Sequence, residues 1–375
     1  MEATPLQDAL HQGGKADQPL AVSDYRGAVS ASRFGDPHEE LAGLLNDCGI
    51  YDLGFRARIS LTGGDRMRWL NGMVTNNIRD LPEGYGVYAF LLNPQGRILG
   101  DMHAYNVGHS LAVETDRSQV EKIIATFDHY IIMDDVEVTD ISQNQTTLGL
   151  AGPNSRGLLN SVGIEVPAMQ PLQMIAPRCS CDCDCVECTV VRGEDPSQES
   201  YEIWLAPKDV LKTWQALIAA GARPVGSEAL EMQRIAAGIP LYGVDIRERD
   251  LPQETEQMRA LNFNKGCYVG QEIVERIRSR GNVHRKFTGF MVEGAETIAA
   301  GTKVMAGEKE VGEITSSAVS GAASGKRTVA LGYIRRDVGT PGREVLIGDA
   351  RAAVIQLPLG SAPWKLADHA VSHKV

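Results

Sequence analysis

The spacing of apolar residues predicts alternating helices and strands over the first two thirds of the chain. Leu41, Leu44 and Leu45 lie on one stripe of a helix predicted over Glu39–Cys48. Apolar and polar residues alternate in Arg58–Thr62, which predicts a strand. Further helices are predicted at Gln119–Tyr130, Asn154–Ser161, Val210–Ala219 and Glu228–Ala237. Further strands are predicted at Val87–Leu92, Ile98–Tyr105, Ser110–Glu114, Val136–Thr139, Leu148–Leu150, Thr189–Arg192 and Tyr201–Leu205.

A different pattern begins after Lys286. Short alternating segments recur between glycine-rich turns up to Leu357, with the spacing of a small all-β barrel or Greek-key unit. The predicted fold class is therefore α+β, with two α+β units followed by a small C-terminal β-barrel. The predicted divisions are a loosely held lead-in at 1–37, a first α+β unit at 38–145, a second at 146–284, the barrel at 285–360 and a tail at 361–375.

The length and charge of the chain narrow the class of protein. A chain of 375 residues exceeds one ordinary domain of about 100–200 residues. Its formal net charge of -11 argues against general nucleic-acid binding. No apolar run approaches the roughly 18 residues of a membrane span. Because residues 1–24 are polar and lack a basic-then-apolar leader, we expect a cytoplasmic protein that does not associate with membranes.

The octapeptide Lys265–Glu272 combines a thiol, an amine, an amide and an acid around a glycine turn. Its sequence is Lys-Gly-Cys-Tyr-Val-Gly-Gln-Glu, and its glycines allow positive φ or close backbone approach. The residues that follow are typical of a helix, so Gln271 lies near a helix start, where free N–H groups gather. Cys267 would lie just ahead of that helix, where a thiolate is stabilised. A buried cysteine in a glycine-rich turn is the alternative.

The octapeptide and a series of shorter motifs in the same order resemble the YgfZ-type folate-binding proteins, relatives of the glycine-cleavage T-protein (aminomethyltransferase). The resemblance covers roughly residues 38–358. The shorter motifs are Asp52-Leu53, Gly63-Gly64-Asp65-Arg66, Trp69-Leu70-Asn71, Asn93-Pro94-Gln95-Gly96-Arg97-Ile98, Leu150-Ala151-Gly152-Pro153, Tyr201-Glu202-Ile203-Trp204, Arg234–Pro240 and Pro252-Gln253-Glu254. The resemblance implies the three-lobed GcvT-like fold, with tetrahydrofolate or a derivative bound as cofactor in its central hole.

The resemblance also implies a set of site residues. In the family, a carboxylate in a Gly-Tyr-Glu-Ile segment accepts hydrogen bonds from the donor pair of the pterin edge, and Glu202 matches it. An outward-facing strand glutamate is the alternative for Glu202, and Glu194 nearby has the sequence context of a turn residue. The implied cofactor-binding positions are Glu202, Asp101, Tyr268, Gln271 and Arg234.

One position departs from the T-protein pattern. The aminomethyltransferases carry two successive aspartates after the hairpin turn, the first assigned to folate chemistry, whereas this chain has Gly100 and then Asp101. Since successive side chains on a strand point to opposite faces, Asp101 is not expected to replace the missing acid. Cys267 stands where the T-protein has no thiol, which shifts the expected chemistry from proton transfer to thiol chemistry. The catalytic candidates are therefore Cys267 and Lys265.

The resemblance implies a tetrahydrofolate-binding YgfZ-type protein that supports the assembly or repair of iron–sulfur cluster proteins through bound folate and Cys267. Its partners would be folate and iron–sulfur proteins or their assembly factors. The alternative is a folate-dependent aminomethyltransferase or a related one-carbon transferase, which Gly100 disfavours. Whether the protein turns over a substrate stays open at this point.

Five of the seven cysteines crowd into a short segment. They are Cys179, Cys181, Cys183, Cys185 and Cys188. A looped form of this segment could hold zinc, copper or iron through thiolates, although the spacing fits no standard structural zinc site. The alternative is a flexible reduced loop. If the segment binds metal, a third hypothesis for the function is a metal-handling protein centred on Cys179–Cys188, with folate incidental.

A basic run follows the octapeptide. Its members are Arg276, Arg278, Arg280, His284, Arg285 and Lys286. A surface for the polyglutamate tail of folate or for an acidic partner is one interpretation, and a solvated helix-and-loop face is the other.

Overall fold

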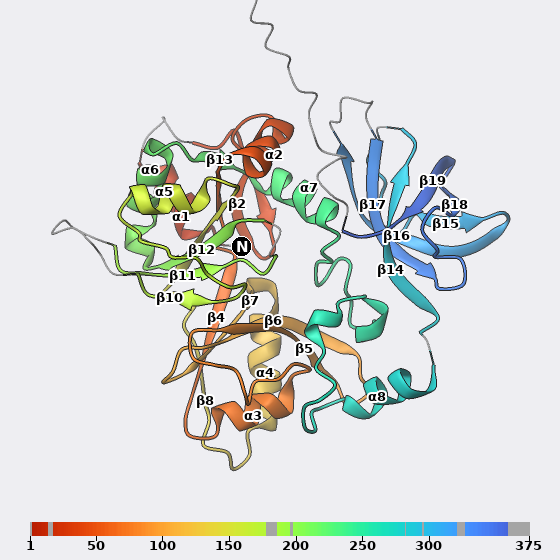
Figure 1. Ribbon diagram of the computed structural model, residues 1–375, viewed down its shortest axis with the longest axis horizontal. Coiled ribbons are helices and arrows are strands. Elements are labelled where there is room, and N and C mark those ends of the chain that lie inside the picture. Colours follow the sequence, from red (N-terminus) through yellow and green to blue (C-terminus); the bar gives the residue numbers. More distant parts are fainter. Residues whose placement is uncertain are drawn as a thin grey trace, which may run out of the picture. The chain divides into compact units, whose positions relative to one another are not determined.

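The computed structural model of the chain describes residues 2–13, 18–177, 186–195, 198–281, 283–294, 296–320 and 327–358. The chain divides into two compact units, whose helices and strands are labelled in Figure 1. Unit 1 comprises Met1–Ala229 and Gln257–Glu275, and unit 2 comprises Leu230–Glu256 and Arg276–Val375. The octapeptide therefore belongs to unit 1, together with residues 257–264 before it and 273–275 after it.

Five antiparallel strands form the first sheet of unit 1. Their spatial order is β5 (Gly86–Leu92), β6 (Ile98–Asn106), β7 (Leu111–Asp116), β4 (Arg56–Thr62) and β8 (Glu137–Asp140). Helices α3 (Arg66–Met73) and α4 (Val120–Tyr130) cover one face, where Leu70 and Phe127 share a buried core cluster with Met102 of β6. Because side chains alternate along a strand, Asp101 and His103 lie on the other face of β6.

Six strands form the second sheet of unit 1. Their order is β10 (Met174–Ile175), β11 (Cys188–Arg192), β12 (Ser200–Leu205), β9 (Thr146–Ala151), β3 (Gly49–Asp52) and β13 (Arg223–Val225). The pair β13–β3 is parallel. Helices α1 (Pro5–Gln12), α5 (Ser155–Ser161) and α6 (Val210–Ala219) contribute to its core. Trp214 of α6 is completely buried there, in the same cluster as Leu6 of α1 and Leu150 of β9.

The N-terminal residues, expected to form a loose lead-in, are folded over their described part. They form α1, the hairpin of β1 (Ala21–Tyr25) and β2 (Ala28–Arg33), and the start of helix α2 (Pro37–Asn46). Thr4 caps α1 by accepting a hydrogen bond of 3.1 Å from the N–H of Gln7, and its hydroxyl donates to the carboxylate of Asp52. Leu6 and Leu10 are buried in the core of the second sheet. The expectation is wrong because a capped helix needs only two leucines, one turn apart, to bury one face.

A closed six-stranded barrel forms the C-terminal part of unit 2, which confirms the predicted β-barrel. Its strands follow one another in the order β14 (Arg285–Val292), β17 (Arg327–Arg335), β16 (Lys309–Ser320), β15 (Lys303–Ala306), β18 (Glu344–Ile347) and β19 (Ala350–Ile355). Strand β14 pairs with both β17 and β19, which closes the ring. Phe290, Val304 and Ile334 are completely buried in the barrel core. Closure removes the free edges that an open sheet would expose.

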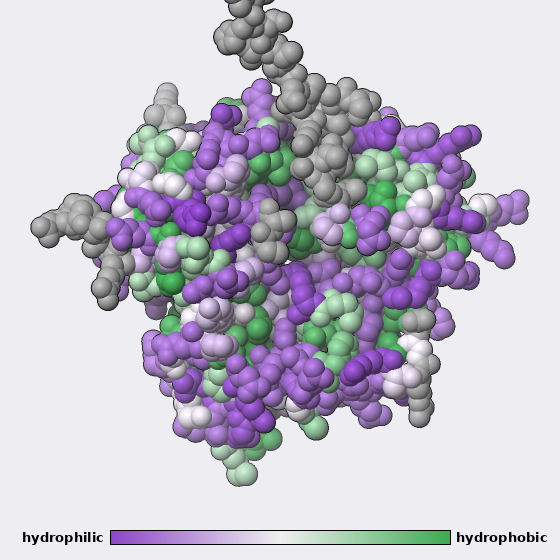
Figure 2. All heavy atoms as spheres, in the orientation of Figure 1, coloured by the Kyte–Doolittle hydropathy of each residue, from purple (hydrophilic) through white to green (hydrophobic). Residues whose placement is uncertain are grey.

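The remaining helical elements are α7 (Ser227–Ala237), α8 (Gln271–Arg280), and the 3-10 helices η1 (Arg117–Gln119), η2 (Pro207–Asp209), η3 (Pro252–Glu254) and η4 (Met258–Ala260). Figure 2 shows hydrophilic residues over most of the visible face, with apolar residues in small patches between them. Within the described ranges, no helix combines the length and the apolar character needed to cross a lipid bilayer.

Candidate functional site

Polar and aromatic side chains gather where the two sheets of unit 1 meet. The ring of Tyr105 in β6 packs edge-on against that of Trp204 in β12, with centroids 5.1 Å apart. A guanidinium nitrogen of Arg56 in β4 lies 3.7 Å from a carboxylate oxygen of Glu202 in β12. We call this group the inter-sheet cluster. Its members are Arg56, Arg58, Tyr88, Asp101, His103, Tyr105, Glu114, Glu194, Glu202, Trp204 and Arg259.

Asp101 is held in this cluster by two side-chain donors. Tyr88 Oη donates a hydrogen bond of 2.7 Å to one carboxylate oxygen, and Gln119 Nε2 donates one of 2.9 Å to the other. The backbone N–H of Asp101 in turn donates to Gln119 Oε1 at 3.1 Å. A carboxylate held in this way has a defined orientation and still has lone pairs for a ligand or a proton.

Gly100 points to the opposite side of β6. A Cβ atom added to Gly100 would meet Gln119 Oε1 at 3.1 Å and two carbons of Ile123 at 3.5 Å. Ile123 belongs to the core beneath α4. Strand alternation therefore separates the two positions as expected, but Asp101 is the residue on the inter-sheet face. The glycine does not remove a carboxylate from this cluster.

His103 follows Asp101 on the same face of β6, two residues along the strand. Its ring lies between those of Tyr88 and Tyr105, with centroid distances of 5.1 and 6.2 Å. Burial, followed by the charge of Arg56, lowers the pKa of His103 to about 4, so the ring is neutral at neutral pH. His103 belongs to no motif of the sequence, although its position two residues after Asp101 on one strand is a signal that points to the same face.

Glu202 points into the cluster and not outward from β12. Trp204 Nε1 donates to one of its carboxylate oxygens at 3.3 Å, and Arg56 approaches the other. Its side chain is 18% exposed. Burial and the negative charge of Glu114 raise the pKa of Glu202, although Arg56 opposes the change. Glu202 is thus a half-buried acid. A ligand group that donates two hydrogen bonds to it would stabilise its ionised form.

Glu114, close to Glu202, is held in place by two ion pairs. Its two carboxylate oxygens accept hydrogen bonds of 2.8 Å from Arg56 and Arg58. Burial would raise the pKa of Glu114, but the charges of the two arginines outweigh it and lower the pKa. The guanidinium of Arg58 also lies 3.8 Å from the ring centre of Trp204. Removal of either arginine would leave the fully buried charge of Glu114 without one of its two partners.

Glu194 and Arg259 form an ion pair at the side of the cluster next to Asp101. The guanidinium of Arg259 lies 4.3 Å from the centre of the Tyr88 ring, and Glu194 Oε2 lies 3.4 Å from His103 Nε2. Glu194 does occupy the turn between β11 and β12, as its sequence context indicates. Arg259 lies in η4, far from Glu194 in the chain, and nothing in its sequence context predicted this contact.

Lys265 ties the octapeptide to the end of α3. Its Nζ donates to the backbone carbonyls of Asn71, Val74 and Asn76, each at 2.6 Å. Carbonyls at a helix C-terminus lack helical partners and favour a cation. Burial, followed by the charge of Arg79, lowers the pKa of Lys265 to about 7. This geometry gives Lys265 a structural role, and its assignment as a catalytic residue stays a prediction.

Cys267 projects from this tightly held turn. The thiol is exposed, whereas the next residue, Tyr268, is buried with its ring centre 5.0 Å from Lys265 Nζ. The N–H of Val269 donates to the carbonyl of Gly72 at 3.1 Å. Helix α8 begins at Gln271, which agrees with the predicted helix start. Cys267 therefore presents an accessible thiol from a turn that its neighbours hold in place. The alternative of a buried cysteine is wrong.

Arg234 belongs to unit 2 and has structural partners there. Its guanidinium donates to Asp245 at 2.6 Å, to Glu231 at 2.7 Å and to Ser316 at 3.0 Å. The side chain is only 6% exposed. These contacts connect α7 to β16. They also account for the burial of the Arg234 side chain without a cofactor.

The metal hypothesis concerns residues that lie mostly outside the described ranges, namely Cys179, Cys181, Cys183 and Cys185. Cys188 begins β11, where burial raises the pKa of its thiol to about 11. Among the described residues, no group of three or more His, Cys, Asp or Glu side chains is placed to hold a metal ion. The described part of the chain thus gives no support for zinc or iron binding.

Arg285 in the basic run is already paired within unit 2. Its guanidinium lies 2.6 Å from a carboxylate oxygen of Asp250 and 3.0 Å from one of Glu254. It also lies over the ring of Tyr333, 4.6 Å from its centre. Arg285 therefore does not support the interpretation of the basic run as a surface for acidic ligands.

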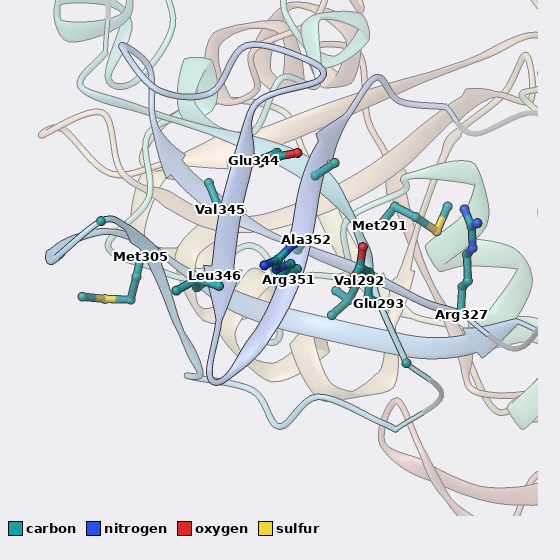
Figure 3. Close-up of a pocket in the computed structure, with 13 residues that line it drawn as sticks. Met291, Val292, Glu293, Met305, Arg327, Glu344, Val345, Leu346, Arg351 and Ala352 are labelled. Carbon is teal, nitrogen blue, oxygen red and sulfur yellow. The ribbon is translucent and has the colours of Figure 1, made fainter.

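A cavity of about 740 Å³ lies on the barrel (Figure 3). Val345 and Leu346 of β18 and Arg351 and Ala352 of β19 contribute to its wall. Arg327, which also lines it, is exposed, so the wall is open to solvent. None of the described lining residues is a member of the inter-sheet cluster or of the octapeptide.

Comparison with known proteins relates both parts of the chain to one family. Residues 22–265 match the GCVT N-terminal domain, and residues 285–359 match the glycine cleavage T-protein C-terminal barrel domain. The chain is 27% identical over 328 residues to a putative chloroplastic transferase of Arabidopsis thaliana, covering 86% of this chain and 73% of that protein. It is 27% identical over 339 residues to an aminomethyltransferase of Rubrobacter xylanophilus, covering 89% of each.

A solved structure has the same fold. The glycine cleavage system aminomethyltransferase T from Bartonella henselae matches with a TM-score of 0.83 and 19% identity, over 96% of this chain and 98% of that chain. This likeness confirms the mixed α+β fold with its C-terminal barrel. Because the two domain matches together cover most of its length, the chain belongs to the glycine cleavage T-protein family.

Proposed function

We propose that the inter-sheet cluster of unit 1 binds a reduced folate and that the protein catalyses one-carbon transfer with it. Relatives named aminomethyltransferase support this reaction class. The observation that carries the proposal is the carboxylate of Asp101, which lies on the inter-sheet face and accepts a hydrogen bond from Tyr88. This carboxylate can serve as the acid–base group of the reaction. The glycine at position 100 had disfavoured this function because it leaves no such group at that position.

The donor and acceptor groups of the cluster suit a pterin ring. A pterin edge presents two adjacent N–H donors beside a carbonyl acceptor, which matches a carboxylate next to a guanidinium. Glu202 and Arg56 form such a pair, 3.7 Å apart. Among the described residues, Arg56 Nε and the Nε and Nη1 atoms of Arg58 are buried without a hydrogen-bond partner. A polar ligand that orders this region would satisfy donors that the protein alone leaves unsatisfied.

Each residue of the cluster then has a distinct role. A bound reduced folate supplies a ring nitrogen that accepts or releases the one-carbon unit. Glu202 binds the pterin edge, and Trp204 orients Glu202 through its 3.3 Å hydrogen bond. Asp101 holds or releases a proton at its carboxylate, which Tyr88 keeps in place.

Folate binding is tested by anaerobic calorimetric titration with tetrahydrofolate. The wild type should bind, and Glu202→Gln should bind about 100-fold more weakly because the donor pair of the ligand loses a charged acceptor. Asp101→Asn should bind folate normally but lose about 100-fold or more in a glycine-cleavage exchange assay. A wild-type protein without affinity for tetrahydrofolate would end the proposal. Binding without exchange activity in the wild type would remove aminomethyl transfer and favour the second candidate below.

An exposed thiol supports a second candidate, the YgfZ-type role in the assembly or repair of iron–sulfur proteins. Cys267 presents its thiol to solvent from a turn that Lys265 holds against α3. Iron–sulfur proteins or their assembly factors would be the partners. The test is rescue of iron–sulfur enzyme activities in a deletion strain by Cys267→Ser, with Cys188→Ser as the control for loss of a half-buried thiol. Full rescue by Cys267→Ser would show that the thiol is dispensable.

A further inference from the structure

We propose that Arg259 is a binding site for a carboxylate group of the ligand, and that Glu194 occupies its guanidinium until the ligand arrives. The inference rests on the proposed function, because it assigns a partner to a second part of the molecule bound at Asp101 and Glu202. The ligand class is a ring compound with a carboxylate at some distance from the ring. Neither residue is part of the octapeptide.

The position of Arg259 relates it directly to the proposed acid. Its guanidinium lies 4.3 Å from the centre of the Tyr88 ring, and the hydroxyl of the same ring donates to Asp101 at 2.7 Å. One aromatic side chain therefore separates the cation from the carboxylate. A ligand whose ring lies beside Tyr88 has its substituents within reach of Arg259. The planar fork of a guanidinium can hold a carboxylate through two parallel hydrogen bonds.

The ion pair with Glu194 is one that a ligand can displace. The side chains of Arg259 and Glu194 are 36% and 26% exposed, so solvent screens their attraction. Glu194 lies in the turn between β11 and β12 and has a second partner in His103, whose Nε2 is 3.4 Å from its carboxylate. A glutamate released by Arg259 would therefore keep one polar contact.

The ion pairs of Glu114 differ from the Arg259–Glu194 pair both in burial and in the cost of displacing the acid. Glu114 is completely buried between Arg56 and Arg58 and accepts hydrogen bonds of 2.8 Å from both. Displacement of Glu114 would leave a buried charge without compensation, which is strongly unfavourable. The half-exposed pair is thus the one suited to exchange its carboxylate for that of a ligand.

Two sources would supply the same carboxylate chemistry. One is the glutamate tail of the folate, and the other is the α-carboxylate of an amino-acid co-substrate such as glycine. The two are distinguished by comparing tetrahydrofolate with tetrahydropteroate, which has the same ring system but no glutamate, and by titrating glycine separately.

The experiment compares Glu194→Gln with Arg259→Gln in the full-length protein. If Glu194 competes with the ligand, Glu194→Gln should bind tetrahydrofolate about three- to tenfold more tightly, whereas Arg259→Gln should bind it about tenfold or more weakly. Both variants should bind tetrahydropteroate like the wild type. If an amino acid supplies the carboxylate, the same pair of opposite changes appears in the KM for glycine, and folate affinity is unchanged.

A merely structural ion pair has a different signature. Both variants would then weaken binding of tetrahydrofolate and tetrahydropteroate alike, or change neither folate affinity nor the KM for glycine, and either result would overturn the inference. Thermal denaturation of both variants shows whether each is folded. The matched controls are Arg335→Gln and Asp337→Asn, which remove an ion pair on the barrel whose side chains are 53% and 61% exposed.

The failure of this inference is separable from failure of the proposed function. If the wild type does not bind tetrahydrofolate, the proposed function itself is wrong. If the wild type binds and Glu202→Gln weakens binding, while Glu194→Gln and Arg259→Gln change affinity in the same direction, only the carboxylate site is wrong.

Discussion

Tyr88 of β5 and Asp101 of β6 lie diagonally across the strand pair, since Tyr88 is opposite His103 and Asp101 is opposite Phe90, and the phenol donates a 2.7 Å hydrogen bond to the carboxylate. Burial and the charge of Asp101 raise the pKa of Tyr88 well above its usual value, so the phenol stays protonated and remains a donor. The pair makes the acid of the proposed site an oriented group instead of a mobile surface side chain.

The Tyr88 hydroxyl is tested by Tyr88→Phe, which keeps the ring beneath Arg259. We expect kcat of one-carbon transfer to fall about tenfold, with folate affinity within about twofold of the wild type, because one hydrogen bond to the acid is lost. Tyr130→Phe, at the end of α4, is the control for loss of a phenol elsewhere in unit 1. Unchanged kcat in Tyr88→Phe would mean that the hydroxyl does not orient Asp101 for catalysis.

The contact between the hairpin turn and helix α8 is tested at Gly96. Its φ is +71°, and a Cβ atom there would lie 2.7 Å from Cβ of Ile273. Gly96→Ala should therefore lower the free energy of unfolding of unit 1 by about 2 kcal/mol or more. In Gly157→Ala the new methyl group meets nothing within 4 Å and lies in helix α5, so it should raise stability by about 0.5–1 kcal/mol. Chemical denaturation followed by tryptophan fluorescence measures both, and equal effects of the two substitutions would contradict the close contact.

The buried carboxyl group of Asp52 should make the free energy of unfolding depend on pH. Burial raises its pKa from 3.8 to about 6, although hydrogen bonds from Thr4 and Gly54 oppose the change. Because the folded state then holds a proton that the unfolded state has lost, stability from this group is greatest below pH about 4 and falls as pH rises through about 6. Asp52→Asn should match the wild type near pH 4 and exceed it by about 2 kcal/mol above pH 7.

The measurement is the difference in unfolding free energy between wild type and Asp52→Asn from pH 4 to 8. Asp349→Asn, in an exposed turn of the barrel, serves as the control for charge removal. A difference that does not vary with pH would show that Asp52 ionises in the folded state as it does in the unfolded chain.

The structural role of Lys265 is tested by Lys265→Met. The substitution leaves the carbonyls of Asn71, Val74 and Asn76 without the donor that they share, which should cost about 1–3 kcal/mol. Amide hydrogen exchange should accelerate at Val269, whose N–H bonds to Gly72, and in the adjoining turn. Lys303→Met, which removes an exposed ion pair with Glu310, is the control. Exchange at wild-type rates in Lys265→Met would refute the anchoring role.

Much of the fold could be predicted because it depends on local patterns. The alternation in Arg58–Thr62 lies within β4, the amphipathic segment Val210–Ala219 matches α6, and the repeated short segments after Lys286 form the closed barrel. The N-terminal helix α1 was not predicted, because its two buried leucines stand in a polar stretch whose partner, α6, lies about two hundred residues away in the chain.

The candidate site was predictable only in part. Glu202 and Asp101 followed from short motifs, and both lie in the inter-sheet cluster. His103, Glu194 and Arg259 come together from a strand, a turn and a 3-10 helix, so their contacts depend on the packing of distant segments. No spacing rule in the sequence contains that information.

The sequence by itself determined the α+β class, the C-terminal barrel and the helix start after the octapeptide, because periodicity and order of motifs are properties of the chain alone. Only the tertiary structure decided that Asp101 and not position 100 faces the cluster, that Lys265 is committed to three carbonyls of unit 1, and that Arg259 is paired with Glu194. The physical reason is the same in each case. The chemical role of a charged side chain depends on its burial and on its partners, and both are set by segments that meet only when the chain folds.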